Sequence, residues 1–159
     1  MIPAAVAIML RDGDQGEGLE ALFIHRAARA GDTWSGQIAF PGGRREPTDT
    51  DLRTTAVRES REEIGVDLTA AEPLGVLDDV YPRTPVLPPV VVRPFVFGVA
   101  ERPPITLSAE VQDAFWVSLR ELTAPGARGD VRSLPAYVVG NHTIWGMTER
   151  ILTNLLTIS

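Results

Sequence analysis

The chain has 159 residues, 44% of them hydrophobic, and its 21 Asp and Glu residues outnumber 15 Lys and Arg residues, for a net charge of -6. A chain of this length can bury roughly 70% of its unfolded surface around one core, so we expect a single domain over residues 1–159. The acidic balance argues against a general nucleic-acid-binding surface. Cysteine and lysine are both absent, which excludes disulfides, thiolate metal sites, Cys or Lys nucleophiles and a lysine-containing phosphate loop.

The first predicted element is a strand over residues 4–10, an apolar run that meets Arg11 and Asp12. The run lacks a basic leading segment and is too short for a signal peptide or a membrane span. We therefore expect a cytoplasmic protein without a membrane partner. A second strand, residues 19–26, follows a turn-rich segment, and a short strand, residues 38–40, leads into Gly42 and Gly43.

A helix is expected from about residue 51 to residue 64. Asp49, Thr50 and Asp51 are all able to cap its N-terminus, because short polar side chains accept hydrogen bonds from the first free amides of a helix. Gly65 is suited to end it, since glycine adopts the left-handed conformation of a helix C-terminus without strain. The predicted helix carries most of the charged residues in this part of the chain.

Three glutamates of this helix share one face, because about 100° per residue places Glu59, Glu62 and Glu63 within one arc. At an effective dielectric of about 20, two carboxylates about 6 Å apart repel by roughly 3 kcal/mol. An enclosed face of this kind requires a cation, and Mg²⁺ takes carboxylate, water and phosphate oxygens as ligands. A solvated acidic face is the alternative. Gly42 and Gly43 favour the metal site, because glycine lets the backbone turn sharply and approach a ligand.

Further strands are expected over residues 74–80 and 90–99, around a proline-rich connection, and over residues 114–117. A short helix follows at 118–122, and residues 137–145 are expected to form a hairpin about Gly140 and Asn141. From Thr148 onward, apolar residues recur at helical spacing and predict a helix that packs on the sheet. This order of elements indicates a mixed α/β fold.

Residues 43–66 resemble the signature of the Nudix hydrolases, G-x5-E-x7-R-E-U-x-E-E-x-G-U, in which U is a bulky aliphatic residue. The matching residues are Gly43, Arg58, Glu59, Glu62, Glu63, Gly65 and Val66. Two features depart from the signature. Ser60 stands at an aliphatic position, and the loop is one residue longer, so that Asp49 and Asp51 flank the first acidic place. The resemblance implies the Nudix α/β/α sandwich with a mixed β-sheet.

The longer loop, the Phe-Pro-Gly-Gly sequence at 40–43 and residues 142–152 are similar to the coenzyme A pyrophosphatase branch of that family. One element departs: the branch's R-S/A-x3-R-x3-G sequence begins at Arg26, but its second arginine and its glycine are out of register here. The resemblance implies a Mg²⁺-dependent hydrolase, with Mn²⁺ as a second cation, that cleaves a nucleoside diphosphate linked to another group. Coenzyme A or its thioesters are the leading substrates. A hydrolase of nucleoside triphosphates or nucleotide sugars and a non-catalytic nucleotide-binding module are the alternatives, and a homodimer is left open.

The resemblance also assigns roles by position. Glu59 and Glu63 are the expected metal ligands, with Glu62 as a third and the Gly43 carbonyl as a fourth. Bound metal would neutralise phosphate charge and activate a water for in-line attack on phosphorus. Arg58 is expected to orient a carboxylate, because Glu62 lies four residues away on the helix; an ordinary surface pair is the alternative.

Other candidates lie outside the helix. Glu110, before the predicted strand at 114–117, is the candidate general base, with a solvated loop acid as the alternative. Arg26, Arg44 and Arg45 are adjacent to the predicted site and are candidate phosphate contacts, because arginine recognises phosphate through paired hydrogen bonds.

Four residues with aromatic or imidazole rings are further candidates. Trp34 and Tyr81 are candidates for stacking on a base, although packing or solvation is the more common role of such residues. His25 and His142 lie beside predicted strands, and we expect both to be structural imidazoles rather than catalytic groups.

Overall fold

The structure, a computed structural model, describes residues 1–28, 37–83 and 89–158, so the stacking candidate Trp34 lies outside the described residues. In chain order, its elements are β1 (Ile2–Asp12), a 3-10 turn η1 (Asp14–Gly16), β2 (Leu19–Arg26), β3 (Ile38–Ala39), β4 (Gly42–Arg44), α1 (Leu52–Ile64), β5 (Glu72–Val76), β6 (Val90–Gly98), β7 (Val111–Ser118), α2 (Leu119–Thr123), β8 (Arg128–Val131), β9 (Leu134–Val139), β10 (His142–Trp145) and α3 (Met147–Ile158). No helix within the described ranges is long and apolar enough to cross a membrane.

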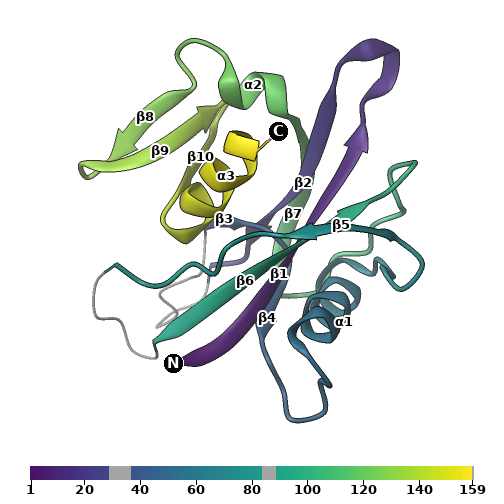
Figure 1. The fold of residues 1–159 in the computed structure, drawn as a ribbon. Coiled ribbons are helices and arrows are strands. Elements are labelled where there is room, and N and C mark those ends of the chain that lie inside the picture. Colours follow the sequence, from purple (N-terminus) through teal and green to yellow (C-terminus); the bar gives the residue numbers. More distant parts are fainter. Residues whose placement is uncertain (29–36, 84–88, 159) are drawn as a thin grey trace.

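A seven-stranded sheet forms the centre of the fold, with the order β3-β2-β1-β6-β5, and with β4 paired to β1 and β7 paired to β2. The long pairing of β1 with β6 is parallel, and the other pairs in this sheet are antiparallel. The sheet is therefore mixed, as predicted. A smaller antiparallel sheet, β10-β9-β8, lies at one side of the molecule (Figure 1).

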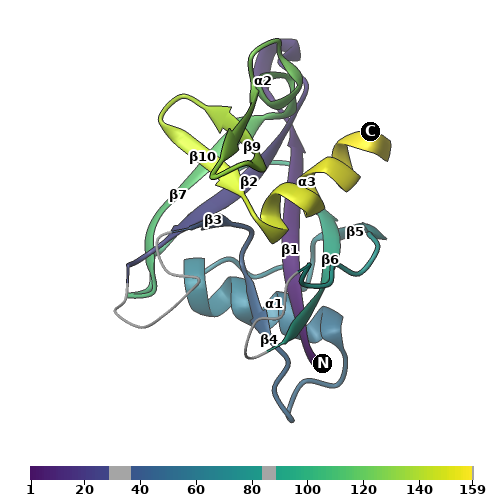
Figure 2. The same cartoon turned by 90° about the vertical axis from the view of Figure 1, so that its left-hand side faces the viewer.

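Strand β1 is buried on both faces, which explains its nearly continuous apolar sequence. Ala7 and Met9 belong to the hydrophobic cluster that contains residues of α1. Ile8 and Leu10 point to the opposite face and join the cluster that contains residues of α3. Helices α1 and α3 therefore cover opposite faces of the sheet, as the two perpendicular views show (Figures 1 and 2). This arrangement has the three layers expected of an α/β/α sandwich.

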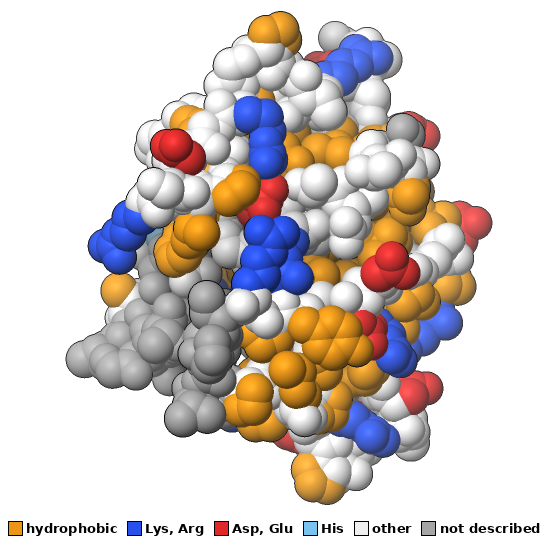
Figure 3. All heavy atoms as spheres, turned by 60° about the vertical axis from the view of Figure 1, so that its left-hand side comes forward, with side chains coloured by type: hydrophobic (Ala, Val, Ile, Leu, Met, Phe, Trp, Pro, Cys, Tyr) orange, Lys and Arg blue, Asp and Glu red, His pale blue; other side chains and the backbone are white. Residues whose placement is uncertain are grey.

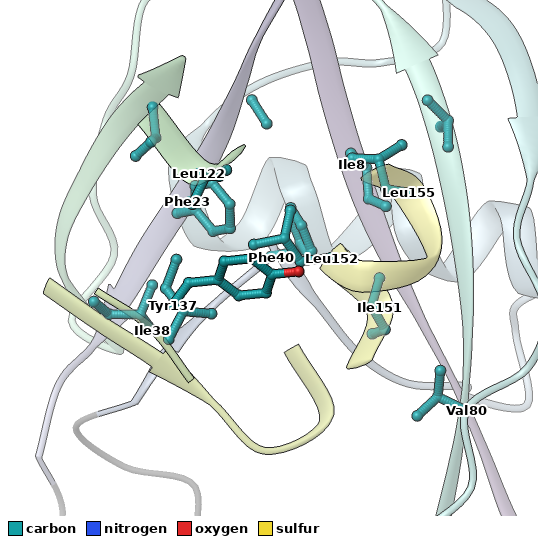
Figure 4. Close-up of a cluster of buried hydrophobic side chains, with 14 of the residues drawn as sticks. Ile8, Phe23, Ile38, Phe40, Val80, Leu122, Tyr137, Ile151, Leu152 and Leu155 are labelled. Carbon is teal, nitrogen blue, oxygen red and sulfur yellow. The ribbon is translucent and has the colours of Figure 1, made fainter. Parts of the chain in front are cut away.

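Helix α3 closes the core between the two sheets (Figure 4). Its residues Ile151, Leu152 and Leu155 are buried, and their three- and four-residue spacing is the one read from the sequence. They pack in one cluster with Phe23 of β2 and Phe40, whose rings are stacked with centroids 4.8 Å apart. The packing fixes the start of α3, whose first turn borders the cleft described below.

Helix α1 has the ends that the sequence predicted. Asp51 is the N-cap residue and accepts a hydrogen bond from the Thr54 amide at 2.8 Å. Gly65 adopts a left-handed conformation, with φ of 70°, and ends the helix. Ser60 is fully buried at the position where an aliphatic residue was expected, and its hydroxyl donates to the Ala56 carbonyl at 2.9 Å. That bond satisfies the polar group inside the core.

Several strands differ from the prediction. The strand expected at 74–80 is β5 at Glu72–Val76, and Val80 makes only an isolated bridge with Val92. Strands β4 and β8 were not predicted, because Gly42–Arg44 and Arg128–Val131 have neither apolar alternation nor β-branched runs. The predicted hairpin is confirmed as β9 and β10, joined at Gly140.

Candidate active site

A cleft of about 340 Å³ lies where β1, β4, α1, β6 and the first turn of α3 meet. Six of the residues selected from the sequence line this cleft: Arg26, Gly43, Arg44, Glu59, Glu63 and Glu110. These residues come from four separate segments of the chain, which the fold brings together in one cleft. Apolar residues line the other end of the cleft, among them Val90, Val92, Met147 and Ile151.

Glu63 is fixed in the inner wall of the cleft, with 2% of its side chain exposed. One carboxylate oxygen, Oε1, accepts the Gly42 amide at 2.8 Å, and the other, Oε2, accepts the Arg26 guanidinium at 2.8 Å. Burial raises the pKa of Glu63, while Arg26 and the Gly42 amide oppose that rise. The two hydrogen bonds give this carboxylate a defined position.

Glu59 lies on the same helix face, one turn before Glu63, with 15% of its side chain exposed. Burial, followed by the negative charge of Glu63, raises the pKa of Glu59 to about 7, although Arg58 opposes the rise. Burial and mutual repulsion therefore disfavour the state in which both carboxylates are ionised. A divalent cation in the cleft would favour the ionised form of both groups, so this donor set fits such an ion.

Gly43 lies so close to Glu59 that a side chain at this position would displace the Glu59 carboxylate. A Cβ atom at Gly43 would lie 2.6 Å from the carboxyl carbon of Glu59 and 2.8 Å from each of its oxygens. Gly42 is equally restricted for a different reason, because a Cβ atom there would lie 2.2 Å from the Ala5 carbonyl oxygen in β1. The two glycines therefore let β4 pass between β1 and the carboxylates.

Arg58 links the helix to the loop that follows β4. Its Nε and Nη2 atoms donate to the two oxygens of Asp49 at 2.9 and 3.0 Å, and its Nη1 atom donates to Glu59 at 2.8 Å and to Glu62 at 3.1 Å. The predicted contact with Glu62 is thus present, together with two that were not predicted. The alternative of an ordinary surface pair does not describe this network, in which Asp49 is 2% exposed.

Asp49 is the residue whose role the sequence left open. It is buried, it accepts the Glu46 amide and the Thr55 hydroxyl at 2.9 and 2.8 Å, and it pairs with Arg58 through both oxygens. The Arg58 hydrogen bonds hold the pKa of Asp49 well below its usual range. The sequence did place Asp49 beside the first acidic position of the signature. The one-residue insertion in the loop shifts this acidic residue along the chain but does not remove it.

Glu62 differs from the other two helix glutamates. Its side chain is 56% exposed, it contacts Arg58, and it is not among the residues that line the cleft. The structure therefore brings Glu59 and Glu63 together inside the cleft and leaves Glu62 at its outer edge. Within the described ranges, no three His, Asp or Glu side chains are already arranged as a metal cage.

The three candidate phosphate contacts have different surroundings. Arg26 lines the cleft but donates to Glu63 and, at 3.2 Å, to the Gly42 carbonyl, so it acts first as a partner of the glutamate. Arg44 is exposed at the cleft edge. Arg45 does not line the cleft, and its guanidinium donates to the loop carbonyl of Asp49 at 3.1 Å, so its contact with a phosphate stays a prediction.

Glu110 reaches the cleft from the loop before β7, where its backbone carbonyl accepts the Ala27 amide at 2.9 Å. Glu110 and Glu63 both line the cleft, and the charge of Glu110 adds to the rise in the pKa of Glu63 that burial causes first. The other candidates lie elsewhere. His142 stacks on Phe115 with ring centroids 4.0 Å apart, and Tyr81 is 52% exposed and does not line the cleft.

Comparisons with known proteins identify the family of this chain. A family model described as the NUDIX domain matches residues 1–137. The mouse protein "Mitochondrial coenzyme A diphosphatase NUDT8" is 30% identical over 149 residues, which cover 84% of this chain and 67% of that protein. The human protein of the same name is 32% identical over 143 residues, which cover 82% of this chain and 58% of that protein.

Solved structures are similar in fold. A Caenorhabditis elegans Ap4A hydrolase matches with a TM-score of 0.63 at 18% identity, covering 76% of this chain and 82% of that chain. A MutT/nudix family protein from Enterococcus faecalis matches with a TM-score of 0.69 at 17% identity, covering 99% of this chain and 61% of that chain. At such identities the likeness concerns the fold alone.

The predicted family and fold class are therefore confirmed, and the family match and the diphosphatase relatives support a hydrolase acting on pyrophosphate bonds. The expected cytoplasmic location stays a prediction, since the mouse and human relatives are named mitochondrial. With the family model covering most of its length and the signature residues Gly43, Glu59 and Glu63 lining one cleft, this chain belongs to the Nudix family.

Proposed function

We propose that this protein is a Mg²⁺-dependent pyrophosphohydrolase, with Mn²⁺ as a second usable cation, and that coenzyme A or its thioesters are its leading substrates. The observation that carries the proposal is the pair Glu59 and Glu63, which share one cleft wall beside the backbone of Gly43. The names of the mouse and human relatives support the substrate, because they are coenzyme A diphosphatases of 30 and 32% identity.

The carboxylates of Glu59 and Glu63 and the carbonyl of Gly43 would hold the cations, with Glu62 as a further ligand from the cleft edge. When bound, the cations would neutralise the pyrophosphate and lower the pKa of a coordinated water. The other residues of the cleft would position these ligands and the substrate. Arg58 holds Glu59 and the loop acid Asp49, and its Nη2 atom ties the helix to β4 by donating to the Arg44 carbonyl at 3.1 Å.

Arg26 positions Glu63, because it binds the carboxylate and the Gly42 carbonyl at once. Glu110 would accept the proton of the attacking water, since it lines the same cleft as Glu63 and belongs to a loop whose backbone is hydrogen-bonded to Ala27 after β2. Arg44, exposed at the cleft edge, would contact a phosphate of the substrate. The apolar end of the cleft would take the part of the substrate that carries no charge.

Two other functions remain as alternatives: hydrolysis of nucleoside triphosphates or nucleotide sugars, and nucleotide binding without catalysis. The out-of-register element after Arg26 is the reason to keep the first alternative. The presence of the carboxylate pair inside the cleft disfavours the second.

A substrate panel tests the proposal. The protein would be incubated with Mg²⁺ and, separately, with coenzyme A, its thioesters, nucleotide sugars, dinucleotides and nucleoside triphosphates, and the products identified by mass. Coenzyme A should yield 3′,5′-adenosine diphosphate and phosphopantetheine, because water adds across the pyrophosphate bond. A clear preference for triphosphates would reject coenzyme A as the substrate but leave the hydrolase intact.

Glu63→Gln should lose most turnover and most of the rise in melting temperature that Mg²⁺ causes, since an ion that binds the native state stabilises it. Glu121→Gln is the matched control, because Glu121 is an exposed helix glutamate far from the cleft lining. Equal Mg²⁺ stabilisation of wild type and Glu63→Gln would place the cation elsewhere. Absence of turnover with every compound of the panel would support the binding module instead.

A further inference from the structure

The first turn of α3 carries a buried threonine, Thr148, which is the second residue of the helix and is 8% exposed. A helical threonine commonly donates its hydroxyl to the carbonyl four residues earlier, as Thr157 does to Thr153 at 2.8 Å. Four residues before Thr148, the chain is still in β10. Within the described part of the chain, the Thr148 hydroxyl makes no hydrogen bond.

This hydroxyl opens into the cleft, because Thr148 is one of the residues that line it. Among the described residues, the one fully enclosed side-chain nitrogen or oxygen without a partner is Nε of Arg11, so the Thr148 oxygen is not sealed inside the protein. A nearly buried hydroxyl costs stability when its hydrogen bond is left unmade. The Thr148 hydroxyl is therefore available to a ligand in the cleft.

The part of the cleft around Thr148 is uncharged. Four aliphatic side chains line the cleft on this side: Val90, Val92, Met147 and Ile151. Gln37 also lines the cleft, and its Oε1 atom lies 3.9 Å from the Cβ position of Gly146, the residue before α3. The start of α3 thus brings a hydroxyl and an amide group to an aliphatic wall.

A nucleobase fits this wall poorly. Proteins commonly hold an unpaired base by stacking it on an aromatic side chain. In the described lining of the cleft, the one aromatic residue is Phe40, which is 1% exposed and stacks on Phe23. An aliphatic chain that carries amide groups fits better, because its methylene groups pack on branched side chains and its amides need hydrogen-bonding partners once they leave water.

A network on α3 and the small sheet holds the first turn of the helix in place. Glu149, next to Thr148, is 7% exposed and accepts a hydrogen bond from Arg128 of β8 at 2.9 Å. Glu149 also accepts the Thr153 hydroxyl at 2.9 Å, and Thr153 contacts the Tyr137 hydroxyl of β9 at 2.8 Å. Acidic and basic side chains lie next to each other on this face of the molecule (Figure 3). Such fixing before a ligand arrives lowers the cost of ordering the site.

We propose that Thr148 hydrogen-bonds the uncharged arm of the substrate, and that this part of the cleft takes an aliphatic chain with amide groups rather than a nucleobase. In coenzyme A that arm is pantetheine, so the inference rests on the proposed function and adds a residue that recognises the arm. The hydroxyl would donate to an amide carbonyl of the arm. The pyrophosphate would lie beside Glu59 and Glu63 in the same cleft.

Calorimetry with the two halves of coenzyme A, phosphopantetheine and 3′,5′-adenosine diphosphate, tests the proposal without turnover, in the presence of Mg²⁺. Thr148→Val removes the hydroxyl and keeps the branched shape of the side chain. It should bind phosphopantetheine about 10-fold more weakly than wild type, as expected for one lost hydrogen bond, and 3′,5′-adenosine diphosphate equally well. Thr148→Ser, which keeps the hydroxyl, should recover most of the affinity. Thr157→Val, at an exposed position near the other end of α3, is the matched control.

Steady-state hydrolysis of coenzyme A gives a second readout. Thr148→Val should raise KM about 10-fold and keep kcat near wild type, because the hydrogen bond is made equally in the ground state and in the transition state. A fall in kcat with unchanged KM would overturn the proposal, since Thr148 would then act on the reacting centre rather than on the arm.

The remaining outcomes separate this proposal from the proposed function. A loss of affinity that falls on 3′,5′-adenosine diphosphate would place the base beside Thr148 and overturn the proposal, as would equal losses in Thr148→Val and Thr148→Ser. If wild type cleaves coenzyme A and neither half responds to Thr148→Val, the inference fails and the proposed function stands. If wild type does not cleave coenzyme A, the proposed substrate fails. Weaker binding of phosphopantetheine by Thr148→Val would still support recognition of the arm in that case, and unchanged binding would overturn it.

Discussion

Replacing Gly43 by alanine separates the geometry of the site from the stability of the fold. The new Cβ atom would lie 2.6 Å from the carboxyl carbon of Glu59, whereas ordinary contacts begin at 3.4 Å. The carboxylate must therefore move by about 1 Å, and misplacement of that size costs on the order of 100-fold in rate. Because the obstacle is the end of a flexible side chain, the free energy of unfolding should change by less than about 1 kcal/mol.

Two other glycine-to-alanine variants serve as comparisons for Gly43→Ala. Gly42→Ala meets backbone instead, with the Ala5 oxygen at 2.2 Å, and should lower the free energy of unfolding by about 3 kcal/mol or more. Gly75→Ala is the matched control, because no atom lies within 4 Å of its Cβ position, so both activity and stability should stay near wild type.

The assay combines steady-state hydrolysis at saturating Mg²⁺ with urea unfolding of the same preparations. Gly43→Ala should keep the unfolding midpoint of wild type and lose turnover. Wild-type turnover in Gly43→Ala would refute the reasoning, because Glu59 would then tolerate the displacement that the geometry imposes. A large loss of stability in that variant would show that β4, rather than the carboxylate, had moved.

Three more predictions follow from the same network. Asp49→Asn should lower the free energy of unfolding in urea by about 3 kcal/mol, because the Arg58 guanidinium would lose its buried carboxylate partner. An unchanged unfolding midpoint would show that the Arg58–Asp49 pair does not stabilise the fold. In chelator-treated protein, the pKa of Glu59 is about 7, above its value near 4.5 in the unfolded chain. Between these two values the native state therefore binds more protons than the unfolded state. The free energy of unfolding should fall as the pH rises from about 4.5 to about 7. The difference in unfolding free energy between wild type and Glu59→Gln should follow that window, and a pH-independent difference would count against it. Glu110→Gln should lower kcat by about 100-fold or more with unchanged Mg²⁺ affinity, and a loss of only a few-fold would return Glu110 to a solvated loop acid.

Elements with strong local signals were predictable from the sequence. Three elements depend on residues that are close together in the chain: the apolar run of β1, the capped helix α1 and the periodic face of α3. In each of them the local propensity favours the same structure as the burial of the apolar side chains does. The acidic face of α1 was predictable for the same reason, since helical spacing alone places Glu59 and Glu63 together. The structure confirms these elements with shifts of a few residues at their ends.

The role of Asp49 and the position of Arg45 were not predictable in this way. Both lie in the loop between β4 and α1, where only the fold decides which carbonyl or guanidinium a side chain meets. The same holds for Glu62, which shares the helix face of Glu59 and Glu63 but lies at the outer edge of the cleft. Helical periodicity fixes the direction of a side chain, whereas its burial depends on the neighbouring elements.

The sequence by itself determined the family, the helix that carries the carboxylates and the strands with continuous apolar runs, because these depend on residue type and on spacing within one segment. Only the tertiary structure decided that β4 passes against Glu59 and that Arg26 holds Glu63. Each of these contacts joins residues at least 16 positions apart, and the backbone pairing of the sheet, rather than local propensity, fixes the distance between them.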